Sequence, residues 1–138
     1  MQASCQCGNL IATIDEGAEP LIAACHCREC QKRSGSPFGV MAYYPRDAVA
    51  IRGAASEYTR PTDEGGTFTN GFCASCGSTL YGRASAYPEI TGITVGTITD
   101  PSFPAPSRSI YEQSRHAWIA MPDATAGFIR GPDGARSR

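Results

Sequence analysis

The stretch CHCRECQKRSGSPFG, residues 25–39, places three cysteines within six positions. The chain carries seven cysteines in all, an odd number. They fall into three local groups: Cys5-Gln6-Cys7, then Cys25, Cys27 and Cys30, then Cys73-Ala74-Ser75-Cys76 followed by Gly77. An odd number of clustered cysteines favours metal binding over a complete set of disulfides.

Length and composition indicate one small, mainly β domain. The chain has 138 residues, with 41% hydrophobic and 18% charged residues, which is enough apolar material for one modest core. Its 15 glycines and 10 prolines favour short strands and many turns over a helical bundle. We expect one zinc-binding domain over residues 1–125 and a flexible, polar C-terminal tail over residues 126–138.

The charge and the hydrophobic pattern argue against two classes of partner. A net charge of −1 gives no electrostatic footprint for nucleic acid or an anionic membrane. No apolar run approaches the roughly 20 residues that cross a bilayer. The N-terminal stretch MQASCQCG has neither a basic nor an apolar leader region. We therefore expect a cytoplasmic protein with reduced thiols, in which metal is the default partner of clustered cysteines.

Short alternating segments mark the expected strands. These lie at residues 8–15, 38–44, 49–53, 66–73 and 89–98, and the segment 109–121 is expected to form a strand followed by a short turn. Residues 59–66 read as a polar loop. One helical turn is expected around residues 29–33, ended by Gly35 and Pro37.

The C-x-x-C-G element is typical of a zinc knuckle, in which a tight turn aims two sulfur atoms at one point. A structural zinc site needs two cysteine pairs, and one such set is Cys5, Cys7, Cys73 and Cys76. Structural zinc contributes on the order of 10–16 kcal/mol of apparent binding energy in small peptides. A site of this kind would decide whether so small a domain folds.

The remaining cysteines are Cys25, Cys27 and Cys30, and a C-x-C-x-x-C segment can wrap three sulfur atoms around one ion. Three protein ligands leave a fourth position for water or substrate, which is typical of catalytic zinc. The cysteine count therefore predicts two zinc ions per chain, one structural and one catalytic.

Three alternatives stay open at the level of the sequence. One C-x-x-C could be a redox pair, although no βαβ pattern accompanies it. The three-cysteine set could be structural, completed by His26, His116 or a second copy of the chain. The pairs could also be crossed, with Cys5 and Cys7 joining Cys25 or Cys27. His26 itself is expected to pack or to form a surface hydrogen bond.

The segments CQCG, CHCRECQKRSGSPFG and FCASCGSTLYG, with SRSIYEQSRHAWI further on, together resemble the glutathione-dependent formaldehyde-activating enzyme family, also called the centromere protein V-like family. The resemblance covers about residues 3–121. It implies zinc-pinned antiparallel sheets of the β-tent type, with the four-plus-three division of the cysteines. It also implies a carbon–sulfur lyase that acts on a small thiol, such as glutathione, and an aldehyde, formaldehyde, to give S-hydroxymethylglutathione.

A metal-bound thiol loses its proton and becomes a nucleophile near neutral pH, so an open zinc suits addition of a thiol to an aldehyde. Competing hypotheses are a non-catalytic, zinc-stabilised binding module and a chromatin-type interaction protein. Other residues have two interpretations each. A substrate carboxylate could be attracted by the basic residues Arg28, Lys32 and Arg33, or these could form a solvated turn. A developing alkoxide could be assisted by Ser34 and Ser36, or these could simply build the turn, and a proton could be moved by Glu29 or His116, or these could be structural. The aromatic residues Trp118, Tyr43 and Tyr44 are expected in the core.

Overall fold

The computed structural model describes residues 1–138. The chain forms two compact units. The first unit comprises Met1–Pro20 and Ala42–Asp100, and the second comprises Leu21–Met41 and Pro101–Arg138. Strand β4 (Gly39–Pro45) begins in the second unit and ends in the first. The fold is mainly β, as expected, and the longest helix has seven residues. No helix has the length and apolar character needed to cross a membrane.

The first unit contains a small antiparallel sheet in the order β1 (Gln2–Ser4), β2 (Ile11–Ile14) and β5 (Val49–Arg52). The alternation expected over residues 8–15 forms β2, in which Ala12 and Ile14 are buried. A 3₁₀ turn, η1 (Arg46–Ala48), leads into β5. Asp47 lies in this turn, which starts directly after Pro45.

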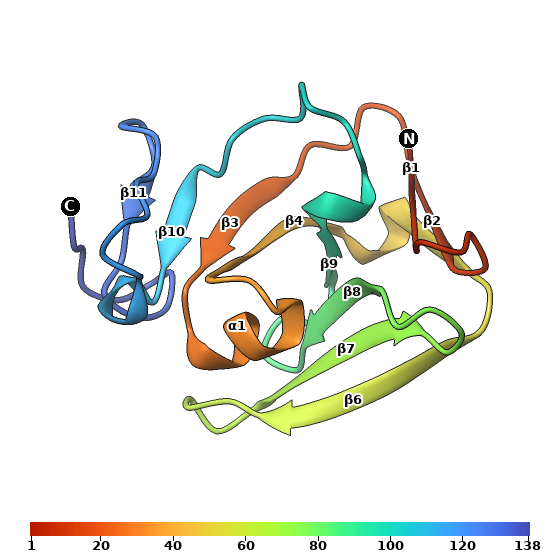
Figure 1. The fold of residues 1–138 in the computed structure, drawn as a ribbon, viewed down its shortest axis with the longest axis horizontal. Coiled ribbons are helices and arrows are strands. Elements are labelled where there is room, and N and C mark those ends of the chain that lie inside the picture. Colours follow the sequence, from red (N-terminus) through yellow and green to blue (C-terminus); the bar gives the residue numbers. More distant parts are fainter. The chain divides into compact units, whose positions relative to one another are not determined.

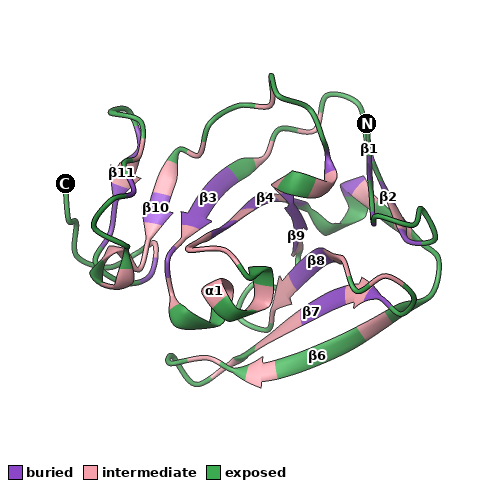
Figure 2. Ribbon diagram, viewed as in Figure 1, coloured by how far each residue is buried: buried purple, intermediate pink, exposed green.

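A longer antiparallel series fills the rest of the first unit. Its strands are β6 (Ala55–Pro61), β7 (Thr67–Cys73), β8 (Thr79–Ala84) and β9 (Ile90–Thr94), which lie side by side in that order (Figure 1). A second 3₁₀ turn, η2 (Val95–Thr97), follows β9. Leu80 and Ile93 are fully buried, and Figure 2 shows β8 and β9 largely buried while β6 is mostly exposed.

The second unit is built on parallel pairing. Strand β10 (Arg108–Ile110) pairs with β3 (Leu21–Cys25) and with β11 (Ala126–Gly127). Helix α1 (Arg28–Ser34) follows β3, and a 3₁₀ turn, η3 (Glu112–Ser114), follows β10 (Figure 1). The antiparallel sheets expected from the sequence are thus joined by a parallel set, and the protein has mixed pairing.

The C-terminal residues are held by backbone hydrogen bonds in the second unit. Phe128 and Arg136 form an isolated bridge, and the amide of Ser137 donates to the carbonyl of Gly127. The domain boundary at residue 125 and the flexibility of residues 126–138 stay predictions.

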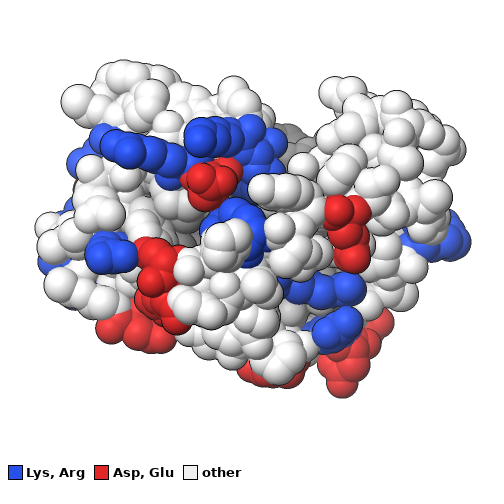
Figure 3. Space-filling model, turned by 90° about the horizontal axis from the view of Figure 1, so that it is seen from below, with Lys and Arg blue, Asp and Glu red and all other residues white.

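Basic and acidic side chains both appear on the face drawn in Figure 3, and neither kind covers it.

Candidate metal centres

The first candidate centre lies within the first unit and is carried by two turns. Cys5 and Cys7 lie just after β1, Cys73 ends β7, and Cys76 lies in the turn before β8. In each turn a glycine has a positive φ, 81° at Gly8 and 79° at Gly77. The amide of Gly8 donates to the carbonyl of Cys5, and that of Gly77 to the carbonyl of Cys73.

The two turns also direct backbone amides at sulfur. The amide of Leu10 donates to Sγ of Cys5 at 3.2 Å, and the amide of Ser75 donates to Sγ of Cys73 at 3.4 Å. At Cys5 burial acts to raise the pKa, but this bond acts to lower the pKa and so favours the thiolate, which is the form that binds metal. The left-handed glycine and the amide–sulfur bond therefore explain why the C-x-x-C-G spacing works as a knuckle.

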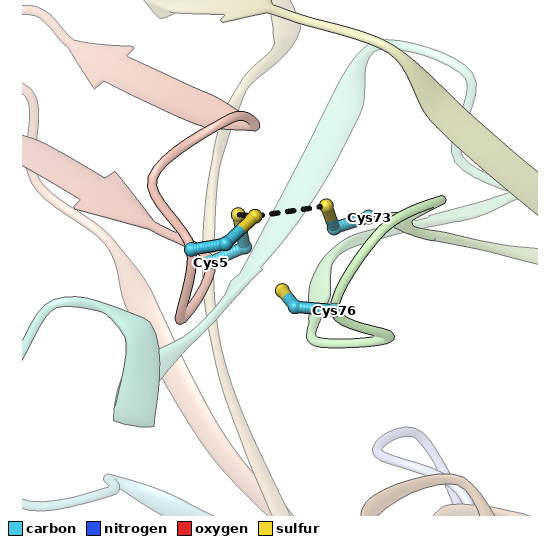
Figure 4. A group of neighbouring side chains, drawn as sticks. Cys5, Cys73 and Cys76 are labelled. Atoms are coloured by element: carbon cyan, nitrogen blue, oxygen red, sulfur yellow. Dashed lines mark hydrogen bonds between the residues drawn. The ribbon is translucent and has the colours of Figure 1, made fainter.

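The four sulfur atoms of this centre converge. All four lie within 4.8 Å of one another, and Figure 4 shows those of Cys5, Cys73 and Cys76 pointing toward one another. Sγ of Cys7 is 3.7 Å from Sγ of Cys5 and 3.6 Å from Sγ of Cys73, and no disulfide forms. Tetrahedral zinc, with Zn–S bonds of about 2.3 Å, puts its sulfur ligands about 3.8 Å apart. This donor set therefore fits zinc.

The thiols of this centre differ in acidity. Hydrogen bonds from the side chain and the backbone of Ser78 lower the pKa of Cys76 to about 5. For Cys7, a backbone hydrogen bond from Asn9 acts to lower the pKa, but lost hydration and the neighbouring thiols raise it to about 11. Four thiolates so close together repel one another, and a cation between them would remove that repulsion.

The second candidate centre lies within the second unit. Cys25 ends β3, Cys27 caps the N-terminus of α1, and Cys30 lies in its first turn. Sγ of Cys27 accepts a hydrogen bond from the amide of Cys30 at 3.3 Å. The three sulfur atoms lie within 4.8 Å of one another, all are half-buried, and none forms a disulfide.

Hydrogen bonds among the three thiols have the largest effect on the acidity of this group. Hydrogen bonds to Cys27 and Cys30, together with burial, raise the pKa of Cys25 far above its ordinary value. At Cys30 a hydrogen bond with Cys25 acts to lower the pKa, but Cys27 and burial raise it overall, while the charge of Arg33 opposes the rise. Crowded thiols, two of which have a raised pKa, are a donor set that a metal cation would stabilise.

The structure distinguishes between interpretations of the cysteines and histidines that the sequence left open. The cysteine pairs are not crossed, since each group of sulfur atoms is complete within one unit. Neither histidine belongs to a sulfur group: Nε2 of His26 lies 2.9 Å from Oγ of Ser109, and Nε2 of His116 lies 3.2 Å from Oε1 of Gln31. Tyr44 is buried as expected, but the core position expected for Trp118 is wrong, because its side chain is 74% exposed.

The sequence analysis did not identify Gln31 as a residue that supports the second centre. Its Nε2 donates to the carbonyl of His26 at 2.8 Å and to that of Ser114 at 3.4 Å. Through these contacts and His116, this side chain joins α1 to the Cys25–Cys27 turn and to η3. The only signal in the sequence is its place directly after Cys30.

A buried polar chain runs behind the second centre. Oγ of Ser109 donates to Oε2 of Glu112 at 2.8 Å, because a carboxylate only accepts. Ser109 must then accept from Nε2 of His26, so Nδ1 of this fully buried ring carries a lone pair and has no partner. Burial lowers the pKa of His26, which keeps the ring neutral. No spacing rule links His26 to Ser109, 83 residues away, which is why the sequence could not reveal this chain.

Fold and sulfur groups together define a small, mainly β protein with two candidate metal centres, one of four thiols and one of three. The sequence model of the family described as "Glutathione-dependent formaldehyde-activating enzyme" matches residues 1–114, and the chain belongs to this family.

Relatives with this description occur in fungi. A protein of Penicillium rubens named "Putative glutathione-dependent formaldehyde-activating enzyme" is 32% identical over 101 residues, which cover 67% of this chain and 52% of that protein. A protein of the same name from Colletotrichum graminicola is 30% identical over 98 residues, covering 65% and 51%. The chain thus spans about half the length of these curated relatives.

One solved structure supports the fold. The crystal structure of a Rhodobacter sphaeroides protein matches with a TM-score of 0.55 and 22% sequence identity, and the match covers 73% of this chain and 92% of that one. At this identity the likeness concerns the fold alone.

Proposed function

We propose that the protein is a zinc-dependent carbon–sulfur lyase that acts on an adduct of a small thiol and an aldehyde, such as glutathione and formaldehyde. The observation that carries the proposal is the group formed by Cys25, Cys27 and Cys30, which offers three thiols to one point and no fourth side-chain ligand. The names of the family and of its relatives favour glutathione and formaldehyde as the substrates.

The two sulfur groups have different proposed roles. Cys5, Cys7, Cys73 and Cys76 would hold a structural zinc, and Cys25, Cys27 and Cys30 would hold a catalytic one. Bound there, the ion would supply an open coordination position and lower the pKa of a substrate thiol. The chain positions these donors rigidly, through the cap at Cys27 and the contacts of Gln31 with His26 and Ser114.

The reaction balances without an oxidant or reductant. In the adding direction the thiol sulfur bonds to the aldehyde carbon, and the carbonyl oxygen takes up the proton that the thiol released. In the lyase direction the carbon–sulfur bond breaks, the carbonyl re-forms, and the sulfur regains its proton. Holding both molecules at one site would supply much of the acceleration. The partners proposed are thus a small thiol and an aldehyde. The location proposed for the reaction is the cytoplasm.

Zinc content and exchange rate test the proposal together. We expect two zinc ions in the wild type and one in Cys27→Ser, with the fold retained and the catalysed exchange between glutathione and formaldehyde, followed by NMR, abolished. Cys76→Ser is the matched control in the other group, and we expect it to unfold the first unit. Wild-type protein that holds both ions without accelerating the exchange would indicate the non-catalytic binding module instead.

A further inference from the structure

Arg33 differs in its surroundings from the two other basic residues of α1. Arg28 and Lys32 are exposed, whereas Arg33 is half-buried. Two ion pairs of the second unit join Glu112 to Arg115 and Arg138, and Arg33 takes part in neither. Glu29 lies four residues before Arg33, at the spacing that favours a helical ion pair, yet no such pair forms. A half-buried guanidinium without a carboxylate partner is suited to binding an anion.

This guanidinium lies close to Cys30, one of the three thiols, and Gly39 is packed against both residues. A Cβ added to Gly39 would come closer than 3.0 Å to Nη2 of Arg33 and within 3.7 Å of Cβ of Cys30. Those two atoms are therefore less than about 7 Å apart. The buried glycine leaves the space that the guanidinium occupies, and its φ is not in the left-handed region. A Cβ at residue 39 would displace the guanidinium without requiring a left-handed backbone.

We propose that Arg33 is the specificity-determining residue of the second centre and binds a carboxylate of the thiol substrate. This inference rests on the proposed function, because it assumes that a substrate sulfur occupies the point on which Cys25, Cys27 and Cys30 converge. The ligand class is a small thiol with a carboxylate a few bonds from its sulfur. Glutathione carries two carboxylates and belongs to this class. A guanidinium binds a carboxylate with two parallel hydrogen bonds, which an ammonium group cannot reproduce.

The test measures dissociation constants of thiols from the zinc-loaded protein by calorimetry, with zinc content and thermal stability recorded for each variant. The probes form two matched pairs: glutathione with its dimethyl ester, and 3-mercaptopropionate with 2-mercaptoethanol. In the wild type we expect each carboxylate-bearing thiol to bind about tenfold more tightly than its counterpart without a carboxylate. Arg33→Gln removes this preference and leaves binding of the neutral 2-mercaptoethanol unchanged.

Three further variants separate position from charge. Arg33→Lys keeps the positive charge but cannot form the two parallel hydrogen bonds of a guanidinium, so we expect a reduced preference for carboxylate-bearing thiols. Gly39→Ala keeps Arg33 but displaces its guanidinium, so its preference falls toward that of Arg33→Gln. Lys32→Gln removes one positive charge from an exposed neighbour on the same helix and keeps the wild-type preference.

Two results overturn the inference, and they differ in what else they overturn. The first result is that Arg33→Gln loses zinc, or that it weakens the binding of both thiols of each pair equally. Arg33 would then stabilise the cysteine thiolates of the chain rather than bind a substrate carboxylate, and the proposed function would stand without it. If the zinc-loaded wild type binds none of the four thiols, the proposed function fails and the inference fails with it.

Discussion

At the scale of single residues, Gly71 and Tyr81 show how tightly the first unit is packed. A Cβ added to Gly71 would overlap three ring carbons of Tyr81, so the ring lies directly over the glycine. The hydroxyl of Tyr81 donates to Oε2 of Glu57 at 2.7 Å, and burial, followed by this bond, raises the pKa of Tyr81 to about 12. The side chain is thereby fixed at both ends.

Gly71→Ala should therefore lower the free energy of unfolding. Because the added methyl group must displace a buried ring, we expect a loss of about 1–3 kcal/mol. Gly96→Ala is the control, since its Cβ would meet nothing within 4 Å, and a change within about 0.5 kcal/mol is expected. Urea titrations of both variants check this. Equal stability of the two would show that the Tyr81 ring does not resist displacement.

The sequence revealed residues whose chemistry depends on local spacing. The knuckle at Cys73 and Cys76 is visible because the turn, its glycine and its sulfur atoms lie within five residues. Ser109 and Glu112 stayed invisible because their role depends on contact with His26 from a distant strand. Trp118 was misplaced because large apolar surface is usually buried, whereas here its contact is an edge-on approach to His116.

At the scale of elements, the segments with clear apolar alternation were predicted and the polar edge strand was not. The predicted segments 38–44 and 49–53 correspond closely to β4 and β5, and the turn around residues 29–33 corresponds to α1. The expected loop at residues 59–66 is partly wrong, because β6 extends to Pro61. Exposed side chains dominate β6, so its order comes from pairing with β7 rather than from its own pattern.

The turn η3 ties β10 to the C-terminal segment through one carboxylate. The side chain of Glu112 is only 5% exposed. It accepts hydrogen bonds from Ser109, Ser137 and Arg138. Burial acts to raise the pKa of Glu112, but these hydrogen bonds lower it below its ordinary value of 4.5 overall.

A pH-dependent contribution to stability follows from this shift. Since the folded pKa lies below the unfolded one, the contribution is present above about pH 4.5 and is lost as the pH falls through the lowered value. We expect Glu112→Gln to cost about 1–3 kcal/mol at pH 7 and to lose less stability than the wild type between pH 6 and pH 3. Denaturant titrations across this range measure both effects.

Glu16→Gln serves as the control for Glu112→Gln. Its carboxylate pairs with the N-terminus at 3.1 Å but is 93% exposed, so its pH profile should follow that of the wild type. Protonation of the cysteines at low pH affects all three proteins alike. Parallel profiles for wild type and Glu112→Gln would contradict a stabilising role of the carboxylate.

At the scale of the whole molecule, each unit contains one complete sulfur group. The group of four joins segments far apart in the chain and would saturate a zinc ion, whereas the group of three lies within six residues and would leave one position of its proposed ion open. The two proposed ions should therefore differ both in how readily they leave and in how much structure each supports.

We expect a chelator to remove zinc in two phases of one equivalent each. The faster phase should come from Cys25, Cys27 and Cys30, because an open position lets the chelator bind before any thiolate leaves. The slower phase should be accompanied by unfolding of the first unit, since a closed site contributes folding energy directly. A coloured chelator and circular dichroism follow both events. Cys27→Ser should show the slow phase only, and a single phase of two equivalents would contradict the division.

The distance along the chain between Cys7 and Cys73, 66 residues, also has a consequence for biosynthesis. At translation speeds of roughly 5–20 residues per second, the local trio emerges from the ribosome several seconds before the distant quartet has its last two donors. In a nascent chain, the proposed catalytic centre would thus be able to bind zinc before the proposed structural centre is complete. Under zinc scarcity, newly made molecules should hold zinc at the group of three only transiently, because this group releases its ion more readily and the group of four binds it once its last two donors have emerged.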